Sequence, residues 1–432
     1  MCWSDFRCKF FSFCAFAFLA LSLVFPSGYS YGAAGLTLLA LSGAIVLNHR
    51  PLSHETWLLV AIMLVMGLIW GVDFDTPLAV MHTDFWPRYW LAAITLAIGA
   101  VWGVDLRAVI WGAAAGAVGA LAIASYQYLV LGWSKASGHT NAIQFGDIAM
   151  YLGIAVWAFA LFVEQRKWML IALWGAGACG VLASLLSETR GAWVVAPLLM
   201  LCMLIFLFQQ GRKRLAFGTV AMVLILLAVV VIPYGGKFGA RAELAVAEMQ
   251  QYLKNPQQNS ETSIGQRLEQ WRVALHMIES KPLLGWGVKG ARAEKQRLVD
   301  HGFAHPSIMN YGHAHNEIID MLVKRGLLGC IALIFFYLIP LCVFWPTRKR
   351  LAQFENSTQR AVLGVRMAAA LLPIAYFGFG WTQVFFAHNS GNMFYIFGLV
   401  VFWAALQRLE GKTLQQDAVS ARDIKVSSCT LP

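Results

Sequence analysis

Twelve long apolar segments separated by polar connections dominate the hydrophobic pattern of this chain of 432 residues. Each is close to the roughly 20 residues that a helix needs to cross a bilayer. The pattern therefore predicts an all-α fold, a polytopic membrane bundle of about twelve transmembrane helices. The segments are residues 10–25, 31–48, 56–72, 88–103, 107–131, 147–163, 168–186, 191–209, 214–233, 326–345, 362–386 and 391–408.

One long polar stretch divides this pattern. Residues 1–233 hold the first nine predicted spans, 234–325 form a large loop, 326–409 hold the last three spans, and 410–432 form a polar tail. Within the loop, residues 240–253 and 263–280 have helical patterns, and a short helix is predicted near 291–300. We expect these helices to form a cap over the bundle. The apolar face expected on the second helix consists of Leu268, Trp271, Leu275 and Ile278.

Composition supports a membrane protein. Hydrophobic residues make up 59% of the chain and charged residues 13%, whereas soluble proteins carry about 25% charge. The formal charge of +11 alone would suggest a nucleic-acid partner, but no nucleic-acid motif accompanies it. The first apolar run, 10–25, has the basic start of a signal peptide. A retained span is favoured because another apolar segment follows at once.

The distribution of charge predicts an orientation. Lys and Arg accumulate in cytoplasmic loops of membrane proteins, and here they gather in alternate connections and near both termini. The other connections hold only Arg88, Lys135 and Arg190, beside three aspartates. Both termini are therefore predicted to be cytoplasmic and the long loop to face outward. The basic set comprises Arg7, Lys9, Arg50, Arg107, Arg166, Lys167, Arg212, Lys213, Arg214, Arg348, Lys349, Arg350, Arg408, Lys412, Arg422 and Lys425.

Metal chemistry has little support in the sequence. None of the eight cysteines lies in the long loop, and the sequence has no Glu-x-x-His spacing. Asp73 and Asp75 form an Asp-x-Asp pair, which holds a divalent metal in many glycosyltransferases, but a solvated acidic loop is the favoured interpretation. We expect no metal and no cofactor.

Two histidines and an amide stand immediately before the tenth span. If one helix ran through this stretch, His315 and Gly326 would lie close to three turns apart on one face, with Gly329 a turn further on. A glycine face lets another backbone approach closely. In a helix His313 would point about 200° away from His315, so only one of them could face a given pocket. An unperturbed histidine has a pKa near 6.5, which suits a general base at neutral pH.

Two arginines are candidate anion ligands. Arg190 lies in an outward turn at the start of a predicted span, where a helix N-terminus adds partial positive charge. The alternative is an arginine that reaches lipid phosphates or pairs with Glu188. Arg267 lies in the first turn of the loop helix 263–280, where a cation opposes the helix dipole.

The spacing His315-Asn316, nine residues, Gly326-x-x-Gly329 resembles the signature of the O-antigen ligase/polymerase family of membrane glycosyltransferases. The run from Ser263 to Gly287 is similar to the segment that precedes the histidine in that family. The resemblance implies a GT-C-type, metal-independent enzyme. Arg190 and Arg267 would bind the donor pyrophosphate, with Arg272 a weaker substitute, and His315 would be the base. His313 and Asn316 would assist as substrate-binding residues.

The resemblance also implies the substrates and the location. The donor would be O-antigen on undecaprenyl pyrophosphate, the acceptor lipid A–core oligosaccharide, and the site the periplasmic face of a Gram-negative inner membrane. An O-antigen polymerase and a protein O-oligosaccharyltransferase share the scaffold and remain alternatives. A lipid or solute transporter is the alternative from another class, but the two halves show no repeat.

Overall fold

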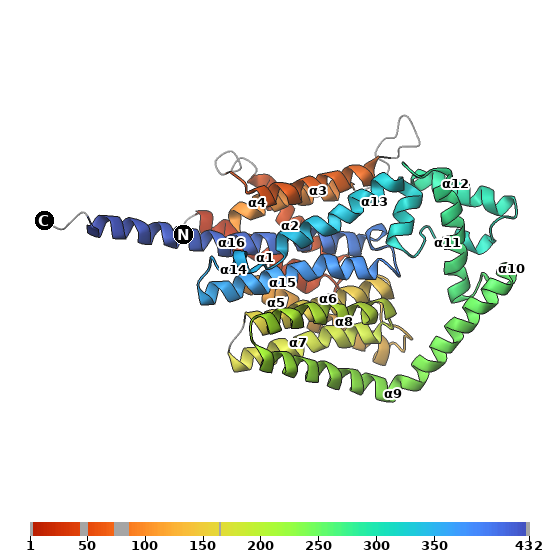
Figure 1. The fold of residues 1–432 in the computed structure, drawn as a ribbon, viewed down its shortest axis with the longest axis horizontal. Coiled ribbons are helices and arrows are strands. Elements are labelled where there is room, and N and C mark those ends of the chain that lie inside the picture. The colour runs from red at the N-terminus through yellow and green to blue at the C-terminus, as the bar shows by residue number, and fades with distance from the viewer. Residues whose placement is uncertain (1–2, 44–50, 73–85, 164–165, 429–432) are drawn as a thin grey trace.

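The computed structural model describes residues 3–43, 51–72, 86–163 and 166–428, and these residues form an all-helical bundle with a smaller helical cap at one end (Figure 1). The bundle helices are α1 (Trp3–Leu21), α2 (Gly28–Ser42), α3 (His54–Gly71), α4 (Trp86–Trp102), α5 (Leu106–Ser125), the π-helical η2 (Tyr126–Val130), α6 (Ala142–Phe162), α7 (Lys167–Leu186), α8 (Arg190–Gln209), α13 (Glu317–Phe344), α15 (Asn356–Phe379) and α16 (Asn389–Ser428). The remaining elements are α9 (Lys213–Lys254), α10 (Pro256–Asn259), α11 (Ser263–Ser280), α12 (Gly287–Asp300), η3 (Pro306–Asn310), α14 (Arg348–Leu351) and η4 (Phe385–Ala387).

The protein is a polytopic membrane protein. Each of the twelve predicted apolar segments overlaps a helix in the described part of the chain. Within that part, 8 helices are long and apolar enough to cross a membrane. They are His54–Gly71, Leu106–Val130, Ala142–Phe162, Lys167–Leu186, Arg190–Gln209, Glu317–Phe344, Ser357–Phe379 and Asn389–Gly411.

Helix α6 forms the centre of the bundle and packs against α5, α7, α8 and α15. It carries few polar side chains, and every residue of its most apolar window is buried inside the protein. Small residues allow its closest approach to α7. A Cβ atom on Gly153 would stand 2.6 Å from the carbonyl oxygen of Gly177, so the two backbones are in direct contact.

Helix α11 of the cap confirms the predicted helix 263–280, since it runs from Ser263 to Ser280. Thr262 caps it by accepting a hydrogen bond from the Gly265 amide at 3.0 Å. The predicted apolar face is wrong, because Leu275 is 57% exposed. The buried apolar residues of α11 are instead Val273, Ala274 and Met277, which belong to the core of the cap. That core comprises Val273, Ala274, Met277, Ala291, Leu298, Ala304, Ile308 and Val323.

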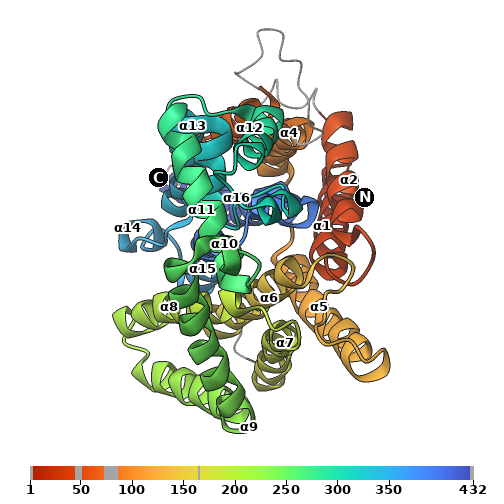
Figure 2. The ribbon, with the colours of Figure 1, turned by 90° about the vertical axis from the view of Figure 1, so that its right-hand side faces the viewer.

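Helix α9 connects bundle and cap without interruption. A span at 214–233 and a separate helix at 240–253 were predicted, but one helix of 42 residues runs from Lys213 to Lys254. At 1.5 Å per residue it is about 60 Å long, roughly twice the thickness of the hydrocarbon core. Figure 1 shows α9 leaving the bundle and reaching α10 beside the cap. In the end view of Figure 2, α11 crosses in front of the bundle.

Helix α13, which contains the tenth predicted span, is broken at Gly326. One continuous helix from His315 to Gly329, the condition for placing these residues on one face, is therefore not formed. Gly326 has φ 60° and ψ −160°, and α13 begins only at Glu317. The amides of Leu327 and Leu328 donate to the carbonyls of Pro282 and Leu283 at 2.8 and 3.2 Å. The turn that follows α11 thus docks on α13 through main-chain bonds.

Alanine at Gly326 is expected to destabilise the fold by more than about 2 kcal/mol, because its Cβ would add a steric clash to a strained backbone. That atom would lie 2.3 Å from the Leu283 carbonyl carbon. The matched control is Gly302→Ala, where φ is also positive but no atom lies within 4 Å of the new Cβ. Its expected cost is about 1 kcal/mol. Thermal unfolding of detergent-solubilised protein measures both, and equal shifts would contradict the close approach at Gly326.

Candidate functional site

The candidate site lies at the end of the bundle that the cap covers, where residues 311–316 connect η3 to α13. Asn316 caps α13 by accepting a hydrogen bond from the Ile319 amide at 3.1 Å, and its own amide donates to the Trp381 carbonyl at 3.5 Å. The Glu317 amide donates to the Gly380 carbonyl at 2.7 Å. The start of α13 is therefore fixed on the connection between α15 and α16.

His315 lies outside the helix, in a left-handed backbone conformation with φ 53°. Such a conformation costs a residue other than glycine of order 1–3 kcal/mol and occurs often at functional sites. The prediction that His313 and His315 point to opposite sides is wrong, because it assumed a helix. Their ring centroids are 4.5 Å apart, and the ring of Tyr311 lies 4.8 Å from that of His315. His388 joins the cluster, 5.5 Å from His313.

The surroundings of His315 favour its neutral form. Burial, followed by the positive charge of Arg267, lowers the pKa of His315 from 6.5 to about 4, although the Gln383 side chain and Asp320 oppose the shift. The Nδ1 atom is buried and has no hydrogen-bond partner within the described residues. The pKa expected from sequence, near 6.5, is therefore corrected downward. At neutral pH this imidazole is ready to accept a proton.

His313 is held neutral by a similar environment. Burial and then the electrostatic influence of the neighbouring His315 ring lower the pKa of His313 to about 3. Its Nδ1 atom accepts a hydrogen bond from the backbone amide of His315 at 3.4 Å. His313 consequently supports the unusual backbone of its neighbour.

The segment Gly312–His315 is also clamped by side chains from two helices. Asp320 of α13 accepts from the Ala314 amide at 3.1 Å, and Lys324 bonds both Asp320, at 2.8 Å, and the Gly312 carbonyl, at 3.0 Å. From α11, the Trp271 indole donates to the Ala314 carbonyl at 2.9 Å. The position of His315 thus depends on contacts with both bundle and cap.

Arg190 and Arg267 come from different parts of the chain and act electrostatically on each other. Arg190 is the first residue of α8, and Arg267 lies in α11. Burial and then the charge of Arg190 lower the pKa of Arg267, and Arg267 in turn lowers the pKa of His315. Within the described residues, neither guanidinium has a hydrogen bond or an ion pair. Arg267 therefore lies within electrostatic reach of both Arg190 and the neutral histidine.

The turn before Arg190 is held by its own hydroxyl groups. The Thr189 hydroxyl donates to the Ala142 carbonyl at 2.8 Å and lies 2.7 Å from the Ser187 hydroxyl. Glu188, the predicted alternative partner of Arg190, forms an ion pair with Lys135 at 3.8 Å. The guanidinium of Arg190 thus has no ion pair with this neighbour.

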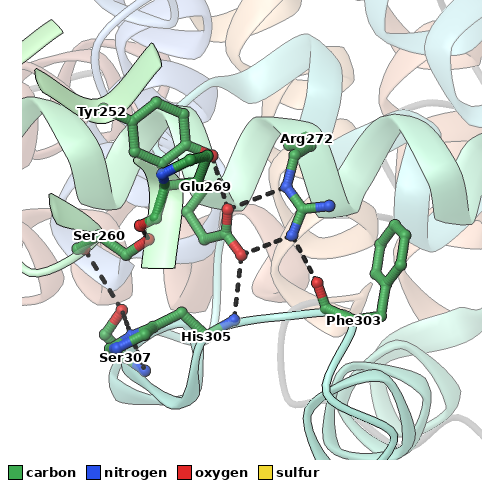
Figure 3. Close-up of polar contacts among 8 residues, drawn as sticks. Tyr252, Ser260, Glu269, Arg272, Phe303, His305 and Ser307 are labelled. Atoms are coloured by element: carbon green, nitrogen blue, oxygen red, sulfur yellow. Dashed lines mark hydrogen bonds and ion pairs between the residues drawn. The ribbon is translucent and has the colours of Figure 1, made fainter. Parts of the chain in front are cut away.

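Arg272 has a structural function in the cap (Figure 3). Its guanidinium bonds both carboxylate oxygens of Glu269, at 2.9 and 2.7 Å, and the Phe303 carbonyl, at 2.6 Å. Glu269 also accepts from the Tyr252 hydroxyl at 2.6 Å and from the His305 amide at 3.0 Å. This network joins the end of α9, α11 and the segment before η3. The guanidinium is engaged there, which makes Arg272 a weaker candidate for a pyrophosphate ligand than Arg190 or Arg267.

Sequence reasoning missed several residues of this site: Tyr311, Asp320, Lys324, Gln383 and His388. Gln383 was included in the predicted span 362–386, but α15 ends at Phe379. The available signal was the polar residues Thr382, Gln383, His388 and Asn389, which stand at and just beyond the end of that predicted span.

Within the described residues, no group of three or more His, Cys, Asp or Glu side chains is arranged to hold a metal ion. Asp73 and Asp75 lie outside the residues that the structure describes. The positive charge of the described site is supplied by its arginines.

Comparison with known proteins places this chain in a class of membrane enzymes. The profile of the family described as "Wzy_C: O-Antigen ligase" matches residues 175–334, which include Arg190, the cap and the His315-Asn316 motif. The chain belongs to this family. Its members are membrane enzymes of the O-antigen ligase/polymerase type, which transfer lipid-linked glycans.

Two relatives define the similarity further. An uncharacterized protein of Haemophilus influenzae Rd is 30% identical over 286 residues, 65% of this chain and 68% of the relative. A protein of Escherichia coli K12 named "O-antigen ligase" is 26% identical over 192 residues, 44% of each chain. The second alignment therefore spans less than half of that relative.

The lowered pKa of His315 gives a prediction for the pH profile. A required base must be neutral, so with an ordinary pKa of 6.5 the value of kcat/KM would fall about fivefold between pH 6.5 and 5.5. Because the pKa of His315 is lowered to about 4, we expect kcat/KM to stay nearly constant down to about pH 5. Initial rates of transfer from pH 4.5 to 8 measure this, and an acid limb centred near 6.5 would contradict it.

Proposed function

We propose that the protein is an O-antigen ligase, which transfers O-antigen polysaccharide from undecaprenyl pyrophosphate to lipid A–core oligosaccharide at the periplasmic face of the inner membrane. Membership of the family and the partial similarity to the Escherichia coli protein support this proposal. The observation that carries it is the grouping of Arg190, Arg267 and His315 at the boundary between bundle and cap.

The charge distribution suits the leaving group of this reaction. A diphosphate diester carries two negative charges, and each guanidinium presents a planar fork that matches phosphate oxygens. Arg190 and Arg267 lack counterions within the described residues, so a bound pyrophosphate would relieve their mutual repulsion. Its negative charge would also offset the influence of Arg267 on His315 and strengthen the base in the substrate complex.

The proposed step is a displacement at the anomeric carbon. The acceptor hydroxyl attacks this carbon while its proton passes to a ring nitrogen of His315, and the Nδ1 atom has no other partner among the described residues. The new glycosidic bond forms as the bond between carbon and pyrophosphate oxygen breaks. The electron pair leaves with undecaprenyl pyrophosphate, whose charge the arginines stabilise. Attack opposite the leaving group inverts the anomeric configuration.

The proposed topology has twelve spans with both termini in the cytoplasm. Helices α1, α2, α4 and α9 would add to the eight spans identified by length and composition. Helix α1 packs against α2 and α5, which supports its retention in the bundle. The positive-inside pattern then puts the cap in the periplasm. The polyprenyl tail of the donor would then lie in the bilayer and its glycan in the periplasm. The energy for transfer would come from the activated bond between the sugar and the pyrophosphate of the donor.

Lipopolysaccharide profiles of a deletion strain test this function. Loss of polymer-capped core with retention of lipid-linked polymer, reversed by the gene in trans, is the result expected of a ligase. A ladder reduced to a single repeat would identify a polymerase, the alternative within the family. A normal profile with loss of glycans from periplasmic proteins would identify a protein O-oligosaccharyltransferase. Unchanged profiles of all three products would contradict a function in glycan transfer.

Transfer is expected to survive metal chelation, because arginines supply the charge that a divalent cation would otherwise provide. The measurement is the rate of transfer by purified protein before and after EDTA treatment and dialysis, with a metal-dependent glycosyltransferase as the control. A loss of activity that Mg²⁺ or Mn²⁺ restores would contradict an arginine-only site and would direct attention to Asp73 and Asp75.

A further inference from the structure

A cavity of about 270 Å³, lined by both apolar and charged side chains, lies inside the cap next to the histidine cluster. Helices α11, α12 and α13 and the segment after η3 enclose it. Its cationic residues are Arg292, Lys295 and Lys324, and Asp320 is the carboxylate on its wall. The remaining lining residues are Ala274, Val288, Ala291, Val323, Met309, Asn310, Tyr311, Gly312 and Ala314.

Lys295 is the residue of this cavity that most needs an explanation. It is 8% exposed, and it forms no hydrogen bond or ion pair with the described residues. Burial is the main cause that lowers the pKa of Lys295. The negative charge of Asp320 opposes this shift, and the positive charge of Lys324 adds to it. A charged residue that is this buried and has no partner is costly, so such a residue normally has a ligand or an ion pair.

The charge balance of the cavity indicates the kind of ligand. Lys324 is bonded to Asp320 at 2.8 Å, which uses the carboxylate of the wall. Lys295 and Arg292 have no such partner in the described part of the chain. Val288, Ala291, Arg292 and Lys295 recur at helical spacing on α12, so the same face presents two cations beside apolar side chains. A ligand with both an anionic group and an apolar ring face fits this surface.

We propose that this cavity is a subsite for an anionic sugar, whose phosphate or carboxylate group binds Lys295 and Arg292. The inference rests on the proposed function, since it assigns the sugar to one of the two glycan substrates. A volume of about 270 Å³ is at the small end of ligand sites and matches one sugar ring with its substituent.

The subsite and the candidate active site share a wall. Tyr311 and Ala314 line the cavity, and the ring of Tyr311 lies 4.8 Å from that of His315. Asp320 also lines the cavity, and its negative charge opposes the lowering of the pKa of His315. A glycan held by its anionic substituent in the cavity therefore reaches the histidine with a neighbouring part of the same chain. Binding there would orient the reacting sugar and lower the entropic part of the barrier.

A binding experiment tests the subsite independently of catalysis. The probes are glucose 6-phosphate and glucose, titrated calorimetrically into detergent-solubilised protein. Saturable binding of the phosphate ester is expected, with affinity falling tenfold or more in Lys295→Gln, because a charge-assisted hydrogen bond is lost. Lys289→Gln is the matched control, an exposed lysine of α12 outside the cavity. Glucose is expected to bind far more weakly.

Other outcomes of the titration would overturn the inference. Binding that survives Lys295→Gln but disappears in Arg267→Gln would assign the anion to the pyrophosphate site. Equal affinity in wild type, Lys295→Gln and Lys289→Gln, or no binding in the wild type, would mean that the cavity does not recognise sugar phosphates.

Transfer kinetics identify which substrate carries the anion. If the acceptor does, Lys295→Gln raises KM for lipid A–core about tenfold and leaves KM for the donor unchanged, and phosphatase-treated acceptor removes the difference from wild type. If the donor repeat carries it, the increase appears in KM for the donor. Unchanged values of both constants would overturn the subsite. Failure of the wild type to use lipid A–core would instead contradict the ligase function, and the titration would still decide the subsite.

Discussion

Replacing His315 with alanine is expected to lower turnover by about 10² to 10⁴-fold, the usual contribution of a general base. The reason is geometric as well as electrostatic. The ring is held neutral beside Arg267, and its Nδ1 atom has no partner among the described residues. Alanine also adopts the local backbone conformation, with φ 53°, at some cost, so the amount of folded protein must be measured alongside transfer.

Two other histidines serve as comparisons for this experiment. His301→Ala is the matched control, because this exposed ring lies 2.7 Å from the Arg297 carbonyl of its own helix. It is expected to retain wild-type turnover. His313→Ala should be impaired less than His315→Ala, since its ring supports the backbone of His315. More than about a tenth of wild-type turnover in folded His315→Ala would exclude the base function, and a larger loss in His313→Ala would transfer that function to His313.

Lysine at either Arg190 or Arg267 is expected to reduce transfer severely, about 10² -fold, although the positive charge remains. A guanidinium binds two phosphate oxygens at once, whereas an ammonium group is a point charge. Both residues are proposed to stabilise one leaving group. The combined loss in the double variant should therefore be smaller than the product of the two single losses.

The measurements are transfer rate and donor affinity for the two single variants and the double variant. Arg214→Lys is the control, an exposed arginine near the start of α9 with no hydrogen bond or ion pair in the described part of the chain. It should behave as wild type. Strictly multiplicative losses, or full activity in either lysine variant, would show that Arg190 and Arg267 do not act together on a pyrophosphate.

Two residues of the candidate site that sequence reasoning identified share a simple property. His315 and Arg190 are charged or titratable side chains in polar connections next to an apolar span, where their presence is costly unless they are used. Arg267 was identified by the resemblance to the family, and the structure places it within electrostatic reach of both Arg190 and His315. The bounds of α11 were predictable because Thr262 is a good N-cap.

What escaped prediction depends on contacts between distant segments. Periodicity does not reveal that Gly326 breaks α13, because the compensating carbonyls belong to Pro282 and Leu283, more than forty positions earlier. The conformation of His315 likewise depends on Asp320, Trp271 and the α15–α16 connection. The ion pair of Arg272 with Glu269, three residues away on the same helix, was not predicted either, because a bidentate ion pair cannot be recognised in a hydrophobic pattern.

The main-chain docking at Gly326 makes the junction sensitive to chain length rather than to side-chain identity. The bonds from Leu327 and Leu328 to Pro282 and Leu283 involve no side-chain atoms, so conservative substitutions at Leu283, which is exposed, leave the pairing intact. Inserting or deleting one residue between α11 and α12 would instead shift the register of every donor and acceptor. Slow hydrogen exchange at these two amides would then report, residue by residue, whether the cap is seated on the bundle.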